Sequence, residues 1–229
     1  MPKLRVHNFS VSVDGFAAGP EQDLAHPVGV DGTRLHEWLF ATRAFADLPP
    51  DGTAARNPRG VDDGFIAAGE VGIGATIMGR NMFGPIRGPW PDLTWTGWWG
   101  EDPPYHHPVF VLTHHPRPAV TMAGGTVFHF VDPGRSGGIG GVLDEAFAAA
   151  GGEDVRLGGG AATISQFLRA ELVDELHLAV VPVLLGRGER LFGAADAVPG
   201  AGSLPGYQCR DIVSSGSVVH VRFAATPVA

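Results

Sequence analysis

Cysteine is nearly absent from this chain of 229 residues, in which Cys209 stands alone. A single cysteine cannot form an internal disulfide framework, so the sequence indicates a reducing compartment. We expect Cys209 to be a half-buried thiol in a C-terminal strand. The ten histidines are scattered and do not reproduce the ligand spacing of a zinc site, so no metal site is predicted.

Long apolar runs and positive charge are also scarce. No segment reaches about 18 consecutive apolar residues, and the first residues lack the apolar stretch of a secretory signal, which argues against a membrane protein. The formal net charge is −8, with 16 Lys and Arg against 24 Asp and Glu. This balance argues against a general nucleic-acid or anionic-membrane surface. We therefore expect a cytoplasmic protein whose contacts with anions are local.

Glycine and hydrophobic residues, in contrast, are plentiful. The chain has 34 glycines and 19 prolines, which imply many tight turns, and its hydrophobic content of 44% suffices for a sizeable core. We find no internal repeat and no linker that would split the chain. The prediction is one domain over residues 1–229, with loop insertions near 47–63 and 85–108.

Apolar patterning predicts alternating strands and helices. Strands are expected at 4–13, 75–78, 109–113, 126–131, 154–157 and 176–185, and helices at about 34–45, 65–71, 141–150 and 161–170. Such alternation is typical of an α/β fold whose sheet has parallel members and covering helices. Two β-rich runs within 207–225 predict an antiparallel hairpin, and Pro182 suggests an edge or a bulge in its strand.

A three-glycine turn, Gly158-Gly159-Gly160, is the most informative local feature. It lies between an expected strand and an expected helix, where glycines let backbone N–H groups approach an anion and the helix start adds unpaired donors. The turn is neither a complete dinucleotide fingerprint nor a phosphate loop ending in Lys-Ser/Thr. A plain strand-to-helix connection is therefore an equally good interpretation of the turn taken alone.

Two other strand ends carry residues that suit a phosphorylated ligand. Arg80 follows one expected strand, and Thr113 with His114 follows another. In an open α/β sheet, ligands bind outside the carboxyl ends of the strands, so these residues and the glycine turn can converge on one ligand. Arg80 would offer two parallel donors to a phosphate. The alternatives are that Arg80 is a surface cation and that His114 is an ordinary loop residue.

The order of these motifs resembles dihydrofolate reductase, and more closely the reductase domain of bifunctional riboflavin-biosynthesis proteins and its stand-alone relatives. The resemblance extends from Arg5 to Phe223. It is carried by Ile77-Met78-Gly79-Arg80, by Val111-Leu112-Thr113-His114-His115-Pro116, by the glycine turn, and by the segments 172–178 and 182–192. It implies a dihydrofolate reductase-like three-layer α/β/α fold with a mixed, mainly parallel central sheet and a C-terminal antiparallel hairpin.

The same resemblance implies that NADPH lies across the strand ends and that the chemistry is hydride transfer. It assigns the adenosine side and its phosphates to Gly79, Arg80, Asn81 and Met82, and a second adenosine segment to Leu112, Thr113 and His114. The pyrophosphate turn would comprise Leu157, Gly158, Gly159, Gly160, Ala161, Ala162 and Thr163. The nicotinamide pocket would be formed by Ser10, Ala17, Ala18 and Gly19.

The chain departs from both families at the acid that reads the substrate. Folate reduction needs a carboxylate on the first helix, where this sequence has Arg34 or Leu35. The riboflavin-pathway relatives place a glutamate directly before the glycine pair, where this sequence has Gly158. The sequence therefore favours neither dihydrofolate nor the riboflavin intermediate as the substrate.

The predicted substrate pocket comprises Asp31, Arg34, Trp38, Trp98 and Trp99. Arg34 and Trp38 are four residues apart in an expected helix and would share one of its faces. Trp98 and Trp99 could stack on a planar ring. The alternative is that the tryptophans are core or dimer contacts.

Three functions are compatible with these features. The first is an NADPH-dependent reductase that acts on a CH–NH or C=N bond of a small, planar, nitrogen-containing substrate, pterin-like or pyrimidine-like. The second is a sensor that binds NADPH without turnover, which the missing acids favour. The third is a reductase that uses a flavin or a deazaflavin in the same cleft. A homodimer formed through residues 176–185 and the terminal hairpin is expected, and no nucleic-acid or membrane partner.

Overall fold

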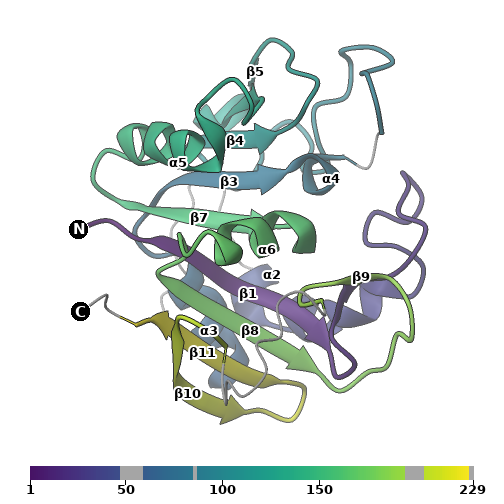
Figure 1. The fold of residues 1–229 in the computed structure, drawn as a ribbon. Coiled ribbons are helices and arrows are strands. Elements are labelled where there is room, and N and C mark those ends of the chain that lie inside the picture. Colours follow the sequence, from purple (N-terminus) through teal and green to yellow (C-terminus); the bar gives the residue numbers. More distant parts are fainter. Residues whose placement is uncertain (47–58, 85–86, 194–203, 227–229) are drawn as a thin grey trace.

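The computed structural model describes residues 1–46, 59–84, 87–193 and 204–226 (Figure 1). Its strands are β1 (Leu4–Ser12), β2 (Phe16–Ala18), β3 (Ile73–Gly79), β4 (Pro108–Leu112), β5 (Val120–Thr121), β6 (Val127–Val131), β7 (Asp154–Gly159), β8 (Glu175–Val181), β9 (Glu189–Arg190), β10 (Tyr207–Ser214) and β11 (Val219–Ala225). Its helices are α1 (Glu37–Phe40), α2 (Arg43–Ala46), α3 (Gly60–Glu70), α4 (Arg80–Phe83), α5 (Gly138–Ala149) and α6 (Ala161–Arg169), with 3-10 turns η1 (Gly32–Leu35) and η2 (Ala123–Gly125).

Nine of the described strands form one sheet in the order β10-β11-β8-β1-β7-β3-β4-β6-β5. The strands from β8 to β6 in this order run parallel to their neighbours, whereas β10 and β11 form an antiparallel hairpin against β8. The mixed, mainly parallel sheet with a C-terminal antiparallel hairpin is therefore confirmed. Because the inner strands are parallel, β1, β7, β3 and β4 all end at the same edge of the sheet.

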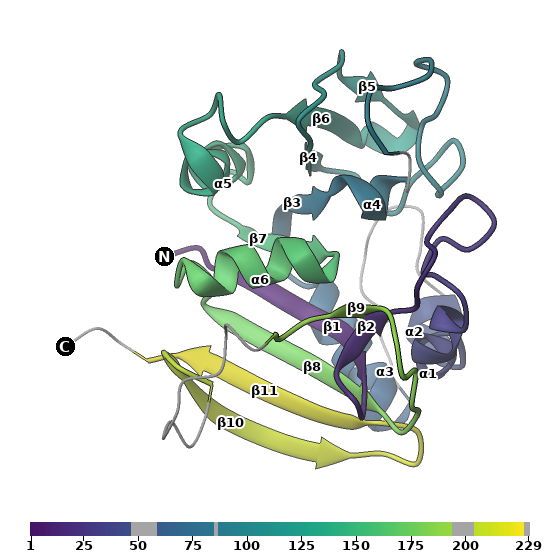
Figure 2. The same cartoon turned by 45° about the vertical axis from the view of Figure 1, so that its right-hand side comes forward.

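Helices cover both faces of this sheet. The long helices α5 and α6 lie on one face, and α3 lies on the other with α1 and α2 beside it (Figures 1 and 2). The predicted three-layer α/β/α arrangement is thus confirmed. The largest buried cluster lies between the sheet and helices α5 and α6, because alternate residues of β1 and β7 point toward these helices. Its members include Leu4, Val6, Val155, Leu157, Val142, Ala146, Ile164 and Phe167.

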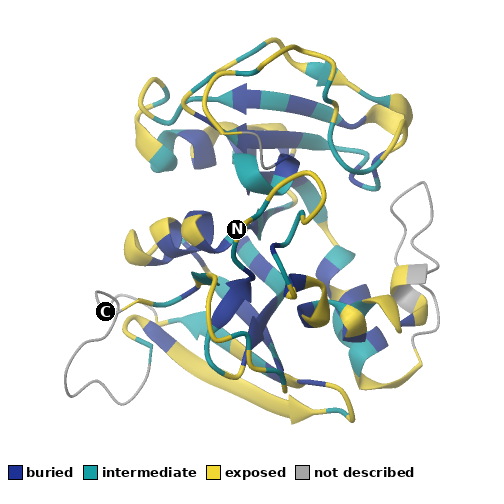
Figure 3. Cartoon of the chain, turned by 90° about the vertical axis from the view of Figure 1, so that its right-hand side faces the viewer, coloured by how far each residue is buried: buried dark blue, intermediate teal, exposed yellow. Residues whose placement is uncertain are grey.

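Two smaller buried clusters complete the core, and both lie beside the parallel strand ends. One joins Leu35, Trp38 and Ile66 to β8. The other lies beneath the tryptophan-rich segment 87–107, which packs on β4 and β6. Figure 3 shows that burial is concentrated in the central strands and in the helix faces turned toward them, whereas the outer hairpin is largely exposed.

The helix predicted at 34–45 is wrong, because η1, α1 and α2 occupy this segment as three short pieces. The hydroxyl of Thr42 explains the break between α1 and α2. Its Oγ1 donates to the carbonyl of Leu39 at 2.7 Å and accepts from the backbone N–H of Phe45 at 3.2 Å. A side chain that bonds to nearby backbone in this way competes with the helical hydrogen bonds.

Three other expectations need correction. Helix α3 begins at Gly60, inside the insertion expected at 47–63, and residues 47–58 lie outside the described part of the chain. Strand β8 ends at Val181 rather than at 185, since Pro182 has no N–H to donate to a neighbouring strand. Cys209 is exposed on the outer strand β10 instead of half-buried.

The terminal hairpin presents exposed apolar side chains at the edge of the sheet. Ile212 is 69% exposed, and Val213 and Val219 are also exposed. The hairpin part of the predicted dimer surface is therefore exposed, whereas most of β8 is buried between β11 and β1 and is not available for such a contact. The homodimer itself stays a prediction. None of the helices in the described part of the chain combines the length and the apolar character that a bilayer-spanning segment needs.

A chain of buried imidazoles ties α3 to three strands. The backbone N–H of Asn8 donates to Nδ1 of His177 at 3.1 Å, so Nε2 of His177 carries the proton of the neutral ring. This Nε2 lies 3.0 Å from Nδ1 of His220, and Nε2 of His220 lies 2.9 Å from Oδ1 of Asp62 on α3. Because the backbone N–H of Asn8 can only donate, the direction of the other two hydrogen bonds is fixed. Nε2 of His177 donates to Nδ1 of His220, and Nε2 of His220 donates to the Asp62 carboxylate.

This burial predicts an acid-labile fold. Desolvation is the main cause that lowers the pKa of His177 to about 2 and of His7 to about 4. In the unfolded chain both rings titrate near the ordinary value of about 6.5, so the unfolded state takes up more protons as the pH falls below this value. The free energy of unfolding should fall by up to about 1.4 kcal/mol per pH unit for each such histidine.

Urea unfolding at pH 7.5, 6 and 5 would measure this loss. The variant His114→Gln is the matched control, because the His114 side chain is 88% exposed and the variant should keep the wild-type dependence on pH. A free energy of unfolding that stays constant between pH 6.5 and 5 would contradict neutral burial of these histidines.

Candidate active site

A cleft of about 710 Å³ lies at the carboxyl ends of the parallel strands and continues over the sheet face beneath α3. Its strand-end part is lined by Ser10, Ala17, Ala18, Asn81, Met82, Gly158, Gly159, Gly160, Ala161 and Glu189. Its inner part is lined by His7, Asn8, Ile66, Glu70, Thr76, Tyr105 and Arg156, and its remaining walls include Trp98, Trp99, Leu39 and Phe40. Polar and aromatic groups therefore meet in one concave site, as is usual for small-molecule sites.

The glycine turn forms the floor at the strand ends because its backbone passes very close to neighbouring side chains. Gly159 has φ of +130°, a conformation that a side chain rarely adopts, and a Cβ there would lie 3.3 Å from the Phe9 ring. The peptide bond between Gly159 and Gly160 is cis. A Cβ on Gly158 would lie 3.2 Å from both Sδ and Cε of Met82, so a methionine occupies the space beside this position.

The adjacent strand β3 approaches the start of α6 equally closely. A Cβ on Gly79 would lie 2.3 Å from Oγ1 of Thr163, well inside van der Waals contact. The glycine at the end of β3 therefore lets α6 begin directly above the strand ends. Thr163 is buried at this contact.

Arg80 lies beyond the mouth of the cleft, and two of its guanidinium nitrogens have no hydrogen-bond partner. Its guanidinium carbon is 3.6 Å from the centroid of the Trp90 ring, and Nη1 donates to the carbonyl of Gly88 at 2.6 Å. Nη1 is also 3.5 Å from Oγ1 of Thr113, so these two strand ends meet as expected. Nε and Nη2 are buried without a partner, and desolvation followed by the nearby charge of Arg117 lowers the pKa of Arg80.

The tryptophan-rich segment 87–107 is anchored by partly buried polar contacts. Trp90 donates its indole N–H to the carbonyl of His115 at 2.7 Å, and Trp95 donates to that of Phe83 at 3.0 Å. Arg117 donates to the carbonyl of Trp95, and its guanidinium carbon lies 4.3 Å from the centroid of the Trp90 ring. These anchors hold Trp98 and Trp99 at the wall of the cleft.

The structure brings together only part of the predicted site. Six predicted cofactor residues at the strand ends line the cleft together with Ser10, Ala17 and Ala18: these are Asn81, Met82, Gly158, Gly159, Gly160 and Ala161. Leu157 is in the core, Ala162 is exposed, and the His114 side chain is 88% exposed beside Asp132. Gly79, Leu112 and Gly19 do not line the cleft, although each adjoins a strand end or a lining residue.

The first-helix part of the predicted substrate pocket lies elsewhere. Asp31 and Arg34 are exposed and do not line the cleft. Trp38 is 4% exposed and donates its indole N–H to Oγ of Ser10 at 2.9 Å, so it supports a residue of the cleft from behind. The expectation that Arg34 and Trp38 share one helix face fails because they belong to η1 and α1, which are separate elements.

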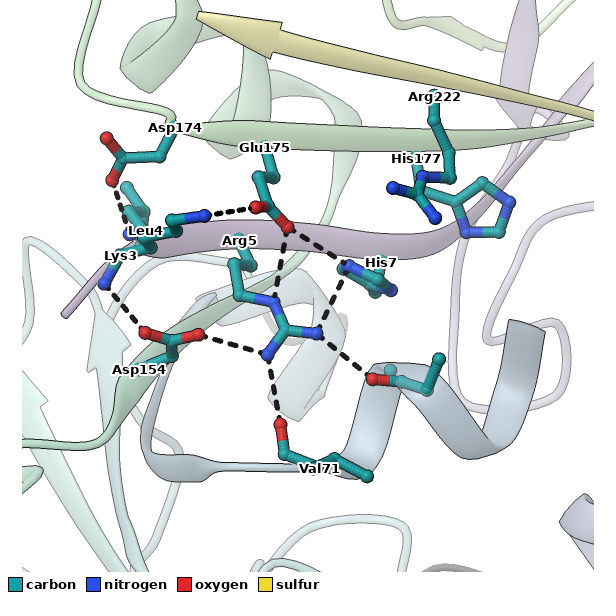
Figure 4. A network of polar contacts seen from close by, with 12 residues as sticks. Lys3, Leu4, Arg5, His7, Val71, Asp154, Asp174, Glu175, His177 and Arg222 are labelled. Carbon is teal, nitrogen blue, oxygen red and sulfur yellow. Dashed lines mark hydrogen bonds and ion pairs between the residues drawn. The ribbon is translucent and has the colours of Figure 1, made fainter. Parts of the chain in front are cut away.

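The inner end of the cleft is built around the C-terminus of α3, where two arginines bind the last carbonyl groups of the helix. Arg5 donates to the carbonyls of Ala68 and Val71, each at 3.0 Å (Figure 4). Arg156 donates from Nη2 to the carbonyl of Gly69 at 2.9 Å and to Oε2 of Glu70 at 2.5 Å. Cations are favourable at this end of a helix, because its free carbonyls carry negative partial charge.

Part of the chain matches a known protein family. Residues 140–221 match the family model described as RibD C-terminal domain, and none of the curated proteins matches the chain. The predicted resemblance is confirmed. The RibD C-terminal match contains the glycine turn and the segments 172–178 and 182–192, which carried the resemblance in this half of the sequence.

Solved structures support the same fold. A protein from Shewanella sp. PV-4 described as a riboflavin biosynthesis protein is 23% identical, with a TM-score of 0.54 over 99% of this chain and 100% of that one. Acinetobacter baumannii RibD is 17% identical, with a TM-score of 0.52 over 99% of this chain and 58% of its own. This chain thus spans somewhat more than half of that RibD.

A third similar structure is the diaminohydroxyphosphoribosylaminopyrimidine deaminase/5-amino-6-(5-phosphoribosylamino)uracil reductase of Thermotoga maritima. It is 13% identical, with a TM-score of 0.52 over 98% of this chain and 57% of that one. This chain thus spans somewhat more than half of the Thermotoga maritima protein as well.

Several lining residues were not found by sequence reasoning, among them His7, Asn8, Glu70, Arg156 and Glu189. One signal was available for Arg156: it lies two residues before Gly158 in a strand, so both face the same side of the sheet. No comparable signal marks Glu70 or Glu189. Glu70 lines the cleft because α3 packs on the sheet, and Glu189 lines it because β9 pairs with β2.

The close approach of β3 to α6 can be tested by a rescue experiment. Gly79→Ala should lower the free energy of unfolding by about 1–3 kcal/mol, because its Cβ would overlap Oγ1 of Thr163. Adding Thr163→Ala removes that oxygen, and the Cβ of residue 163 lies at an ordinary 3.5 Å. The double variant should regain much of the loss in urea unfolding. Strictly additive losses would contradict this contact.

Proposed function

We propose that the protein is an NADPH-dependent reductase that delivers a hydride to a small, flat, nitrogen-containing ring of pyrimidine-like or pterin-like character. The observation that carries the proposal is the convergence of the glycine turn, Thr113 and the unpartnered donors of Arg80 at neighbouring strand ends. The RibD C-terminal match supports a pyrimidine reductase-like function of the riboflavin-pathway type.

The residues at the strand ends fit a dinucleotide phosphate. Nε and Nη2 of Arg80 are buried donors without a partner, which is costly unless an acceptor binds there. Arg80 and Thr113 would hold the 2′-phosphate side, and the backbone from Gly158 to Ala161 would hold the pyrophosphate at the start of α6. When bound, NADPH supplies the hydride.

The remaining residues of the cleft would orient the reacting rings and exclude water. Ser10 is fixed by Trp38, and β2 is held against β9, so Ala17 and Ala18 form a firm wall. Trp98, Trp99 and Tyr105 provide aromatic surface for a flat ring. Burial raises the pKa of Tyr105, so its hydroxyl stays protonated and can donate a hydrogen bond.

One observation favours the second candidate, a sensor that binds NADPH without turnover. The position that carries the glutamate in the riboflavin-pathway relatives is Gly158, and Met82 fills the adjacent space, so no carboxylate can enter from this position. A screen for NADPH oxidation with pterins, pyrimidines, imines and quinones separates the candidates. Tight NADPH binding without oxidation of any of these compounds would favour the sensor.

Replacement of Arg80 tests the cofactor assignment. Arg80→Ala should weaken NADPH binding tenfold or more, since a charge-assisted hydrogen bond is worth about 1.5–3 kcal/mol. NADH has no 2′-phosphate, so its dissociation constant should change much less. Fluorescence titration with both cofactors provides the measurement, and Arg210→Ala, on the exposed strand β10, is the control for loss of one positive charge. Equal weakening of both cofactors would exclude the 2′-phosphate role.

A further inference from the structure

The charges that line the cleft are unevenly distributed. Among the described residues that line it, Arg156 is the single arginine or lysine, whereas Glu70 and Glu189 are both acids. The histidines add no positive charge at neutral pH, because desolvation lowers the pKa of His36 and lowers that of His7 to about 4. At the inner end the charges of Arg156 and Glu70 therefore balance, and the extra negative charge of the described lining comes from Glu189 at the strand ends.

The positive charge of Arg156 is already engaged. Its Nη2 donates to the Glu70 carboxylate at 2.5 Å and to the carbonyl of Gly69 at 2.9 Å. The Arg156 side chain is 17% exposed and that of Glu70 is 22% exposed, so the pair is partly withdrawn from water and is weakly screened. Arg80 differs in having two buried donors free, but it lies outside the cleft.

Such a lining disfavours a phosphorylated substrate. A phosphate that leaves water needs unpaired cations or several free donors to compensate for its lost hydration. At the inner end of the cleft, a phosphate would have to compete with Glu70 for Arg156 and would face the Glu70 charge. The cost of separating a partly buried pair adds to that repulsion.

The same region has groups that suit an uncharged polar ring. Nη2 of Arg5 lies 3.3 Å from Nε2 of His7, and a guanidinium can only donate, so neutral His7 carries its proton on Nδ1. His7 is therefore neutral at this end of the cleft, and the side chains of Trp98, Trp99 and Tyr105 offer aromatic faces to a flat ring.

We propose that this cleft takes a flat, uncharged heterocycle without a phosphate group, and that Glu70 rejects phosphorylated substrates by neutralising Arg156. This inference rests on the proposed reductase function and adds the substrate class. It separates the chain from the Thermotoga maritima relative, whose name specifies a phosphoribosyl substrate.

Two probes test the proposal directly. They are 5-amino-6-(5-phosphoribosylamino)uracil and the same compound without its phosphate, titrated by calorimetry into the full chain with and without saturating NADPH. The wild-type protein should bind the compound without phosphate at least tenfold more tightly. Preference for the phosphorylated compound, or binding of neither compound, overturns the proposal. Failure of NADPH to bind would contradict the proposed cofactor and not the substrate class. The two failures can be told apart because the two probes are also compared without NADPH.

A gain of binding gives a second, independent test. Glu70→Gln frees Arg156 from its carboxylate, so the affinity for the phosphorylated probe should rise at least tenfold relative to the other probe. Glu189→Gln is the matched control, because it removes the same charge from the same cleft without freeing Arg156. Equal changes in the two variants would overturn the role of Glu70. Melting temperatures verify that both variants are folded. If a variant does not fold, the comparison of the two probes on the wild-type protein still tests the proposal.

Discussion

The architecture of the cleft depends on the hydrogen bonds that bind the C-terminus of α3 to the sheet. Arg5 from β1 and Arg156 from β7 donate to the carbonyls of Ala68 and Gly69 in the last turn of this helix and to that of Val71 directly after it. The contact is close because Gly69 has no side chain: a Cβ there would lie 2.6 Å from Nδ2 of Asn8. The helix is thereby held directly over the sheet, and the inner part of the cleft lies beneath its end.

The same interaction separates two electrostatic environments along the cleft. Asp154 and Glu175 pair with Arg5 (Figure 4). Glu70 pairs with Arg156, so both arginines are neutralised where they bind the helix. At the strand ends, Arg80 stacks on Trp90 and keeps two donors unpaired. The proposed anionic cofactor would thus reach Arg80 beyond the mouth of the cleft, and the proposed uncharged substrate would lie inside it.

Sequence reasoning succeeded where a local pattern has a single structural outcome. Alternating apolar residues specified the buried strands, and the three glycines from the end of β7 to the start of α6 specified a segment whose backbone lies close to its neighbours. It failed at residues 34–45, where apolar spacing indicated one helix and the hydroxyl of Thr42 ends α1 early. A side chain that can bond to backbone in several conformations makes apolar spacing an incomplete guide.

The sequence by itself determined the long strands of the sheet with helices α5 and α6, the resemblance to the RibD C-terminal domain, and the position of the glycine turn, Arg80 and Thr113 at neighbouring strand ends. These follow from residues near one another in the chain and from the shared direction of parallel strands. Only the tertiary structure decided that Trp38 supports Ser10 from behind and that Glu70 and Arg156 form the inner end of the cleft. Residues 70 and 156 are distant in the chain, and their pairing depends on how α3 packs on β7, which no local pattern encodes.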